Sequence, residues 1–259
     1  MKLELLVHFV RQELLDRHAG TALGAAWTVL LPLAHILIFT LVFSEVMAAR
    51  LELPGLAELG RHGYAIYLVS GLLAWNAFAN TVTRAAASFR EKAHLLTKVP
   101  LPLLLLPLPA ALAEAVIYAL SMAFFAIFLA LVDFPWHAAA LWVAPLFALQ
   151  QLLALALGTL LAVFSAFLRD LANAVPVVLQ LWFWLTPVVY VPAILPRDWA
   201  WLVGFNPMTA LLANLRGALI AGHSPDWGPL AWVAGLAAAL GVAAVFLTRR
   251  LERDIRDSL

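Results

Sequence analysis

The chain has 259 residues, of which 64% are apolar and 12% charged, and its mean hydropathy is +0.94. Soluble domains carry roughly half apolar residues and about 25% charged ones, and a domain of this size could not hide so much apolar surface from water. The composition therefore predicts an integral membrane protein and excludes disordered, coiled-coil and collagen-like chains. The lack of cysteine excludes a disulfide scaffold, and a net charge of +1 predicts no nucleic-acid partner.

Residues 2–17 have the spacing of a surface helix, with apolar side chains recurring at intervals of three and four positions. Because such residues share one face, the segment is predicted to be an amphipathic helix lying on the inner membrane face. A plain soluble helical lead-in remains the alternative. The segment does not have the pattern of a cleaved signal peptide. The predicted apolar stripe consists of Leu3, Leu6, Val7, Val10 and Leu14.

Six stretches long enough to cross a membrane follow this segment. A spanning helix needs about 20 mostly apolar residues, and six runs of sufficient length contain no Asp, Glu, Lys or Arg over most of their course. The sequence therefore predicts an all-α integral membrane protein with one transmembrane domain over residues 1–259. The expected spans cover about 25–48, 63–83, 110–132, 139–167, 172–191 and 228–248.

An even number of spans places both termini on the same side of the membrane, and the basic residues indicate which side. With cytoplasmic termini, twelve of the 16 Lys and Arg residues fall in cytoplasmic segments, as the positive-inside rule requires. The opposite side carries only Arg50, Arg61, Arg197 and Arg216. The sequence therefore predicts cytoplasmic N- and C-termini.

The first cytoplasmic loop, residues 84–100, mixes charges of both signs with apolar side chains. A short amphipathic helix here would offer a docking surface for a partner protein, whereas an ordinary basic loop is the alternative. Four prolines between 100 and 109 keep this helix from running straight into the next span. The residues expected to contact the partner, including two from the second cytoplasmic loop, are Phe89, Arg90, Glu91, Lys92, His94, Leu95, Lys98, Arg169 and Asp170.

Consecutive aromatic residues mark the fifth span, in which Pro187 is expected to kink the helix. Aromatic faces bind the C–H surfaces of sugars without fixed hydrogen-bond geometry, which suits a polymer that must slide. Anchoring at the membrane interface is the alternative, because Trp and Tyr collect there. The residues predicted to line a path, with two weaker candidates from the second span, are Trp182, Phe183, Trp184, Tyr190, Trp75 and Phe78.

The outer segment 192–216 is rich in prolines and aromatic residues and lacks a long run of charges. This pattern predicts two short re-entrant helices that dip into the outer leaflet and cap a cavity. Irregular backbone at that depth is tolerated only where protein or water covers it. The residues expected to form this outer gate are Pro196, Trp199, Trp201, Asn206 and Pro207.

Several kinds of chemistry find no support in the sequence. No Gly-Lys dipeptide occurs, so a phosphate-binding loop is excluded, and the H-E-x-x-H and G-x-S-x-G motifs are missing. The seven histidines are scattered, so no metal site is expected. Glu114 is the one candidate for an ion relay, near an end of its span. The chain is therefore expected to have no catalytic residues of its own.

Several strings along the chain resemble the permease subunit of bacterial type-2 ATP-binding-cassette exporters, in particular those of O antigen and capsular polysaccharide. The order and spacing of the strings carry the resemblance. They are R-Q-E-L-L-D-R-H-A-G-T-A-L-G-A-A-W-T-V-L-L-P-L (11–33), Y-A-I-Y-L-V-S-G-L-L-A-W-N-A-F (64–78), F-R-E-K-A-H-L-L-T-K-V-P (89–100), F-L-R-D-L (167–171), L-Q-L-W-F-W-L-T-P-V-V-Y (179–190), F-N-P-M-T (205–209) and L-E-R-D-I-R-D (251–257).

The resemblance implies a homodimer that works with two copies of a separate cytoplasmic ATPase subunit. That subunit would bind ATP and Mg, so this chain is expected to hold no cofactor. The implied cargo is a polysaccharide on an undecaprenyl-diphosphate lipid, and the implied location is the bacterial inner membrane, with lipid around the spans. We hypothesise that ATP-driven closure of the ATPases pushes on Arg90–Lys98 and on the amphipathic N-terminal helix, and that the first and fifth spans then separate at the dimer interface.

Two other functions remain open at this stage. An exporter of small hydrophobic molecules or drugs would need a narrower and more aliphatic path. An intramembrane enzyme, such as a lipid-linked sugar transferase, would need polar catalytic groups near the inner interface, where Glu91 and Asp170 are the convergent acids. A passive channel would need a ring of like charges, and the sequence contains no pattern that predicts one.

Overall fold

A computed structural model describes residues 2–16, 21–42, 62–96, 101–192, 198 and 200–259. The regular elements in these ranges are all helical. Short 3-10 turns, η1 (Gly24–Ala26), η4 (Leu103–Leu105) and η5 (Ala138–Trp142), separate some of them. The α-helices in chain order are α1 (Lys2–Asp16), α2 (Trp27–Thr40), α3 (Gly63–Glu91), α4 (Ala93–Leu96), α5 (Leu108–Leu131), α6 (Val143–Phe167), α7 (Leu171–Leu185), α8 (Ala200–Gly204), α9 (Pro207–Leu219), α10 (Trp227–Arg250) and α11 (Glu252–Ser258).

Four helical segments in the described ranges are long and apolar enough to cross a membrane. They are α3, η4 with α5, η5 with α6, and α10, which correspond to the second, third, fourth and sixth predicted spans. Helix α7, in the place of the fifth span, has 15 residues, and α2 has 14. The predicted first span, 25–48, runs beyond residue 42 and so lies partly outside the described residues. The chain is a helical, membrane-spanning protein.

Helix α7 ends earlier than the expected fifth span. Instead of a helix that kinks at Pro187 and continues to residue 191, the helix stops at Leu185, and Thr186 takes an extended conformation with φ −106° and ψ 133°. The ring of a proline crowds the residue before it and disfavours helical geometry there. Pro187 therefore ends the helix two residues upstream of itself, while Pro176 is accommodated inside it.

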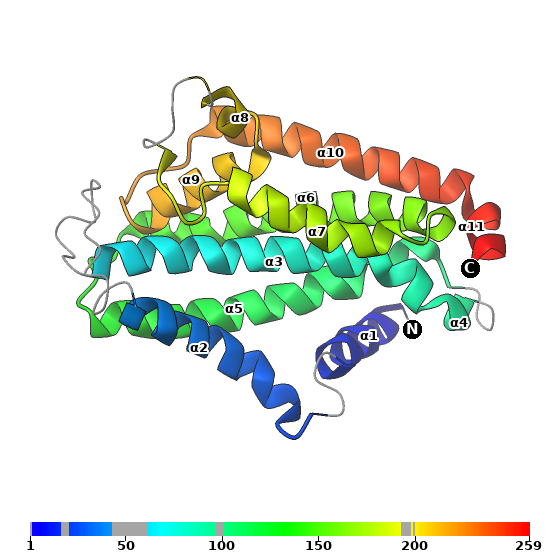
Figure 1. Ribbon diagram of the computed structural model, residues 1–259, viewed down its shortest axis with the longest axis horizontal. Helices are drawn as coiled ribbons and strands as arrows, with labels where there is room; N and C mark the ends of the chain where they lie inside the picture. The colour runs from blue at the N-terminus through cyan, green and yellow to red at the C-terminus, as the bar shows by residue number, and fades with distance from the viewer. Residues whose placement is uncertain (1, 17–20, 43–61, 97–100, 193–197, 199) are drawn as a thin grey trace.

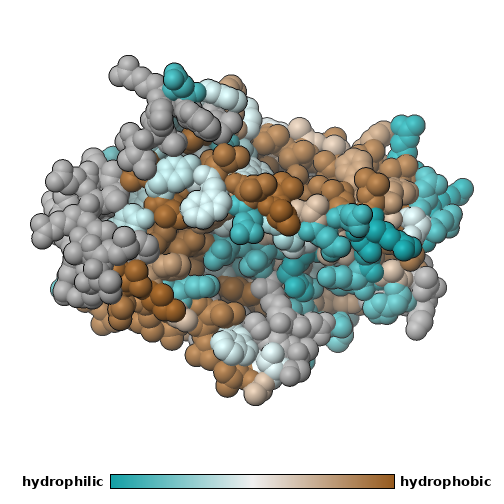
Figure 2. All heavy atoms as spheres, in the orientation of Figure 1, coloured by the Kyte–Doolittle hydropathy of each residue, from teal (hydrophilic) through white to brown (hydrophobic). Residues whose placement is uncertain are grey.

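The long helices lie roughly side by side, with their ends at two opposite poles (Figure 1). One pole holds α1, α4, α11 and both chain ends, and the other holds α8, α9 and the first turns of α3. Apolar residues cover much of the visible surface, while hydrophilic residues gather at the pole with α4 and α11 (Figure 2). Exposed apolar side chains such as Leu131 and Val242, at 78% and 71% exposure, suit contact with lipid.

Helix α3 is the centre of the bundle and packs closely on α6. A Cβ atom at Gly158 of α6 would lie 2.6 Å from the Cβ of Ala85, so only glycine permits this approach. Buried polar side chains bridge the same pair of helices: Gln150 Nε2 donates to the Ala74 carbonyl at 2.8 Å, and Ser165 Oγ donates to the Ala86 carbonyl at 2.8 Å. Small residues and satisfied polar groups at the contact are typical of helix packing in membranes.

Candidate functional site

A buried carboxylate joins the N-terminal helix to the inner end of α3. Glu13 of α1 accepts a hydrogen bond from Arg84 Nε and lies 3.8 Å from Lys92 Nζ, while its side chain is only 8% exposed. Lys92 also lies over the ring of Phe9, 5.4 Å from its centroid. Two cations from α3 and its C-terminal cap thus share one anion of α1. The three ionic groups, Glu13, Arg84 and Lys92, are called the inner ion cluster below.

Helix α1 packs on the protein with a different face from the predicted apolar stripe, which was expected to meet the membrane. Phe9 and Glu13 are buried, whereas Val7, a member of the predicted stripe, is 61% exposed. The helix therefore has two distinct contacts. One face packs on the chain, and a second, with exposed Val7 and Leu15, is free for the membrane surface.

The residues predicted to contact a partner do not share one surface. Phe89 is fully buried in an apolar cluster with Phe9, Leu103 and Ile255 of α11, so it supports this end of the molecule rather than projecting from it. Arg90 donates to the carbonyl oxygen of Arg169 at 2.5 Å, which brings the two cytoplasmic loops together.

Of the other members of this predicted set, Lys92 belongs to the inner ion cluster, and the rest are exposed or undescribed. Helix α3 continues through residues 84–91, so much of the expected loop is the end of a long helix. Lys98 and the side chain of Leu95 lie outside the described residues. The members whose side chains are exposed are Glu91, His94, Arg169 and Asp170.

Four of the six predicted lining aromatics form one cluster between α3 and α7. The ring centroids of Trp75 and Trp182 are 6.2 Å apart, those of Trp75 and Phe183 5.7 Å, and those of Phe78 and Trp182 5.5 Å, all in edge-on geometry. Edge-to-face packing at these distances stabilises buried aromatic pairs. Phe78 is fully buried and Trp75 is 4% exposed, so in this conformation neither lines a path at the subunit surface.

Trp184 and Tyr190 are arranged differently. Trp184 is 62% exposed on α7, and the Tyr190 hydroxyl donates to the Trp184 carbonyl at 3.3 Å. The Tyr190 carbonyl in turn accepts from the Tyr67 hydroxyl at 3.0 Å. Consecutive residues on a helix point in different directions, which explains why Trp182 faces inward and Trp184 outward. Trp184 is therefore the aromatic side chain of α7 that the fold leaves most exposed.

Asn206 connects the end of α7 to the start of α9. Its Oδ1 accepts from the Met208 amide at 3.0 Å, as an N-cap does, and from Trp182 Nε1 at 3.1 Å, while its Nδ2 donates to Thr186 Oγ1 at 2.8 Å. Pro207 follows at the first position of α9, where the missing amide proton costs nothing. Of the predicted outer-gate residues, Trp201 is 63% exposed, whereas Pro196 and Trp199 lie outside the described residues.

Arg216, which was expected only as a charge on the outer side, holds several elements together. This side chain of α9 is 7% exposed and donates to the carbonyls of Tyr67, Pro187 and Val188 at 2.7–2.9 Å. Its guanidinium also lies over the Tyr67 ring, 3.5 Å from the centroid. Burial lowers the pKa of Arg216 to about 10, so the group stays charged at neutral pH. One arginine thus joins α3, the turn after α7, and α9.

The two tryptophans in the last turn of α7 should respond differently to truncation. We expect Trp182→Ala to lower the unfolding temperature in detergent, because it removes an aromatic contact on Trp75 and the indole hydrogen bond to Asn206. Trp184→Ala removes a ring that is exposed on the subunit and should lower that temperature much less. Equal losses of stability in thermal melts of the two purified variants would contradict this assignment.

The chain matches the family model described as ABC-2 type transporter over residues 4–220. It is 30% identical over 254 residues to the O-antigen export system permease protein RfbA of Myxococcus xanthus, covering 96% of this chain and 93% of that protein. Two proteins of the same description from Klebsiella pneumoniae are 26% and 25% identical, over 85% and 82% of this chain and 81% and 79% of their own lengths. The chain therefore belongs to the ABC-2 type transporter family and is an integral membrane protein of it.

Proposed function

We propose that this chain is the permease subunit of an ATP-driven exporter that moves a lipid-linked polysaccharide, O antigen or capsule, across the bacterial inner membrane. The observation that carries the proposal is the similarity to three O-antigen export permeases over 82–96% of the chain. The composition and the helical bundle agree with a subunit that forms a passage rather than one that performs chemistry. The proposed carrier lipid is undecaprenyl diphosphate.

The proposed assembly is a homodimer of six-span subunits, with α2 and α7 supplying the first and fifth spans. One subunit of six helices is too small to enclose a path as wide as a sugar chain, whereas two subunits provide twelve helices. Helix α7 exposes large apolar side chains, among them Val178, Leu181 and Trp184 at 59–64%, and α2 exposes Leu37 and Ile38 at 59% and 56%. These faces suit burial against a second copy, and their separation would open the path.

The proposed energy source is a pair of separate ATPase subunits on the cytoplasmic side. The pole with both termini is hydrophilic, and there Arg90 holds the two predicted cytoplasmic loops together. Exposed charges of both signs at Glu91, Arg169 and Asp170 suit electrostatic docking of a partner. A push on α4 would be passed through the inner ion cluster to α1 and along α3. ATP and Mg would be bound by the ATPase subunits alone.

The test removes the gene from its native host and restores it on a plasmid. The proposal predicts that the deletion strain loses surface polysaccharide while lipid-linked polymer accumulates inside, and that the tagged chain co-purifies with an ATPase in equal numbers. An exporter of small hydrophobic molecules would instead leave surface polysaccharide intact and change the resistance of the cells to drugs. That result would overturn the proposal.

A further inference from the structure

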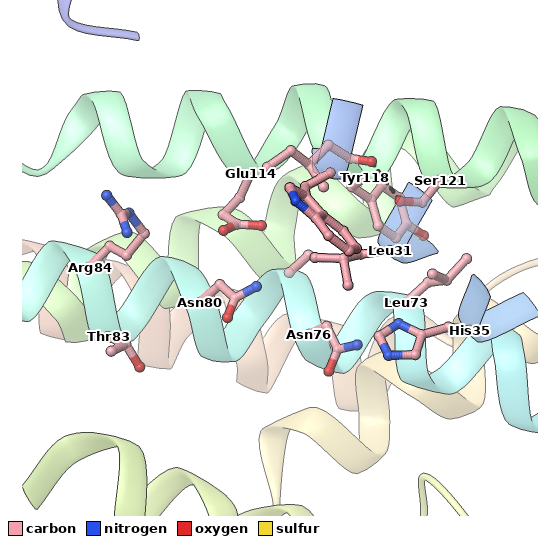
Figure 3. A pocket seen from close by; sticks show the side chains of 13 residues that line it. Leu31, His35, Leu73, Asn76, Asn80, Thr83, Arg84, Glu114, Tyr118 and Ser121 are labelled. Carbon is pink, nitrogen blue, oxygen red and sulfur yellow. Dashed lines mark hydrogen bonds between the residues drawn. The ribbon is translucent and has the colours of Figure 1, made fainter. Parts of the chain in front are cut away.

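An open cavity of about 540 Å³, lined by polar and apolar side chains, lies between α2, α3 and α5. Figure 3 shows Asn76 and Asn80 of α3 beside this cavity, with Glu114 and Tyr118 of α5 across from them and His35 of α2 at one end. Residues four apart share a helix face, so the two asparagines form a short polar stripe along α3. The volume falls in the range of sites that bind organic ligands.

Placing polar side chains in the middle of a membrane-spanning helix costs free energy unless they find polar partners. Asn76 and Asn80 are exposed although they sit in the middle of a spanning helix, and Glu114, at 1% exposure, belongs to the wall of the same cavity. The Tyr118 hydroxyl is buried and has no hydrogen-bond partner among the described residues. Polar groups within a membrane face the bundle interior or a water-filled path, where they usually serve function. Lipid is therefore an unfavourable occupant of this cavity.

The chemistry of the lining fits neutral sugars better than an anion. Each asparagine amide both donates and accepts, as does the hydroxyl of Tyr118, and these groups complement the hydroxyls of a sugar ring. Arg84 is the cation at the inner end of the cavity, but its Nε already donates to Glu13. With Glu114 adding a carboxyl group, the cavity has no surplus positive charge that would favour a diphosphate.

We propose that this cavity, the α2–α3–α5 groove, is a sugar-binding section that each subunit contributes to the export path. It would bind hydroxyl-rich residues of the passing polymer through Asn76 and Asn80. This inference deepens the proposed function and rests on it. It differs from an aromatic lining on α7, because the groove uses amides on the opposite side of α3 from the buried Trp75 and Phe78 cluster.

The test uses the absence of cysteine from the chain, because an introduced cysteine is then the only thiol in this subunit. Asn80→Cys is expressed with the partner ATPase in the native host and in a strain that lacks the first enzyme of polymer synthesis. Membranes are treated with MTSET, a cationic thiol reagent that reacts in water. The proposal predicts rapid labelling without polymer and severalfold slower labelling when polymer is made. Asn76→Cys, one turn away, repeats the measurement if Asn80→Cys assembles poorly.

A control variant and the pattern of labelling distinguish the polymer from lipid or a second copy of the chain as the occupant of the groove. Val242→Cys, on the exposed face of α10, should stay unlabelled in both strains because lipid surrounds it. Equal labelling of Cys variants of the groove in both strains would overturn the proposal, and so would no labelling in either. A disulfide-linked dimer on oxidation would assign the groove to a second copy instead. Surface polysaccharide is measured in the same cells. If the wild-type chain exports none, the proposed function fails, whereas normal export with equal labelling refutes only the groove assignment.

Discussion

Replacing Arg216 with leucine should prevent the outer half of the subunit from folding stably. Leucine keeps much of the volume but removes the Arg216 donor from the carbonyls of Tyr67, Pro187 and Val188, of which Tyr67 still accepts from Ser70 Oγ. A buried polar group without a partner costs about 1–3 kcal/mol, and the carbonyls of Pro187 and Val188 lose theirs together. We expect a loss of monodisperse protein in detergent, measured by size-exclusion chromatography, and a lower unfolding temperature for the fraction that remains.

The same contact can be disturbed from the opposite side. A Cβ at Gly71 would fall well inside van der Waals contact of the Arg216 guanidinium, so Gly71→Ala should also destabilise the protein, by about 1–3 kcal/mol for overpacking. Gly217→Ala is the matched control, since a Cβ there meets no atom within 4 Å and alanine favours the helix. If Gly71→Ala and Gly217→Ala melted at the same temperature, the arginine would not be the connection that the structure indicates.

Neutralising Glu13 should uncouple ATP hydrolysis from export. In Glu13→Gln the chain keeps the shape of this side chain but loses the negative charge that pairs with Arg84 and Lys92 in the inner ion cluster. Hydrogen bonds to charged groups are worth about 1.5–3 kcal/mol, so α1 should be held much less firmly on the end of α3. We expect the purified complex to retain ATP hydrolysis while export of polysaccharide falls severalfold.

Hydrogen exchange provides a readout that does not depend on transport. The amides of α1 should exchange faster in Glu13→Gln than in the wild type, because local opening becomes easier when its tertiary contact weakens. Arg11→Gln is the control: it removes one exposed charge from the same helix and should alter neither exchange nor export. Unchanged exchange and full coupling in Glu13→Gln would show that the ion cluster transmits nothing.

Helices were predictable from the sequence where apolar length alone determines them. The expected spans 63–83 and 228–248 begin at or next to the first residues of α3 and α10. The end of α3 was missed because a charge-free stretch locates the edge of the membrane, not the end of a helix. Three alanines at 85–87 favour continuation of the helix, and α3 extends to Glu91. Helix α7, in contrast, is shorter than expected. Pro187 disfavours helical geometry at Thr186, the residue before it, so the helix ends at Leu185.

Side-chain roles that depend on contacts far apart in the sequence could not be found in this way. Trp182 and Asn206 were both predicted as site residues, but nothing in their spacing showed that one donates to the other across the end of α7. Arg216 looked like an outer charge because its partners are backbone carbonyls, which have no sequence signature. Glu13 was not predicted as a site residue, because its role depends on the contact with Arg84, which lies 71 positions away in the sequence.

Above all, we propose that this permease has no energy source of its own and moves a polymer for a separate ATPase. The most direct measurement places the chain in sealed proteoliposomes, with and without the ATPase from the same host, and follows protection of lipid-linked polysaccharide from an external glycosidase. We expect the polysaccharide to be protected from the glycosidase in an ATP-dependent way only when both proteins are present. ATP hydrolysis by the chain alone, or no transport of polymer by the complete complex, would contradict it.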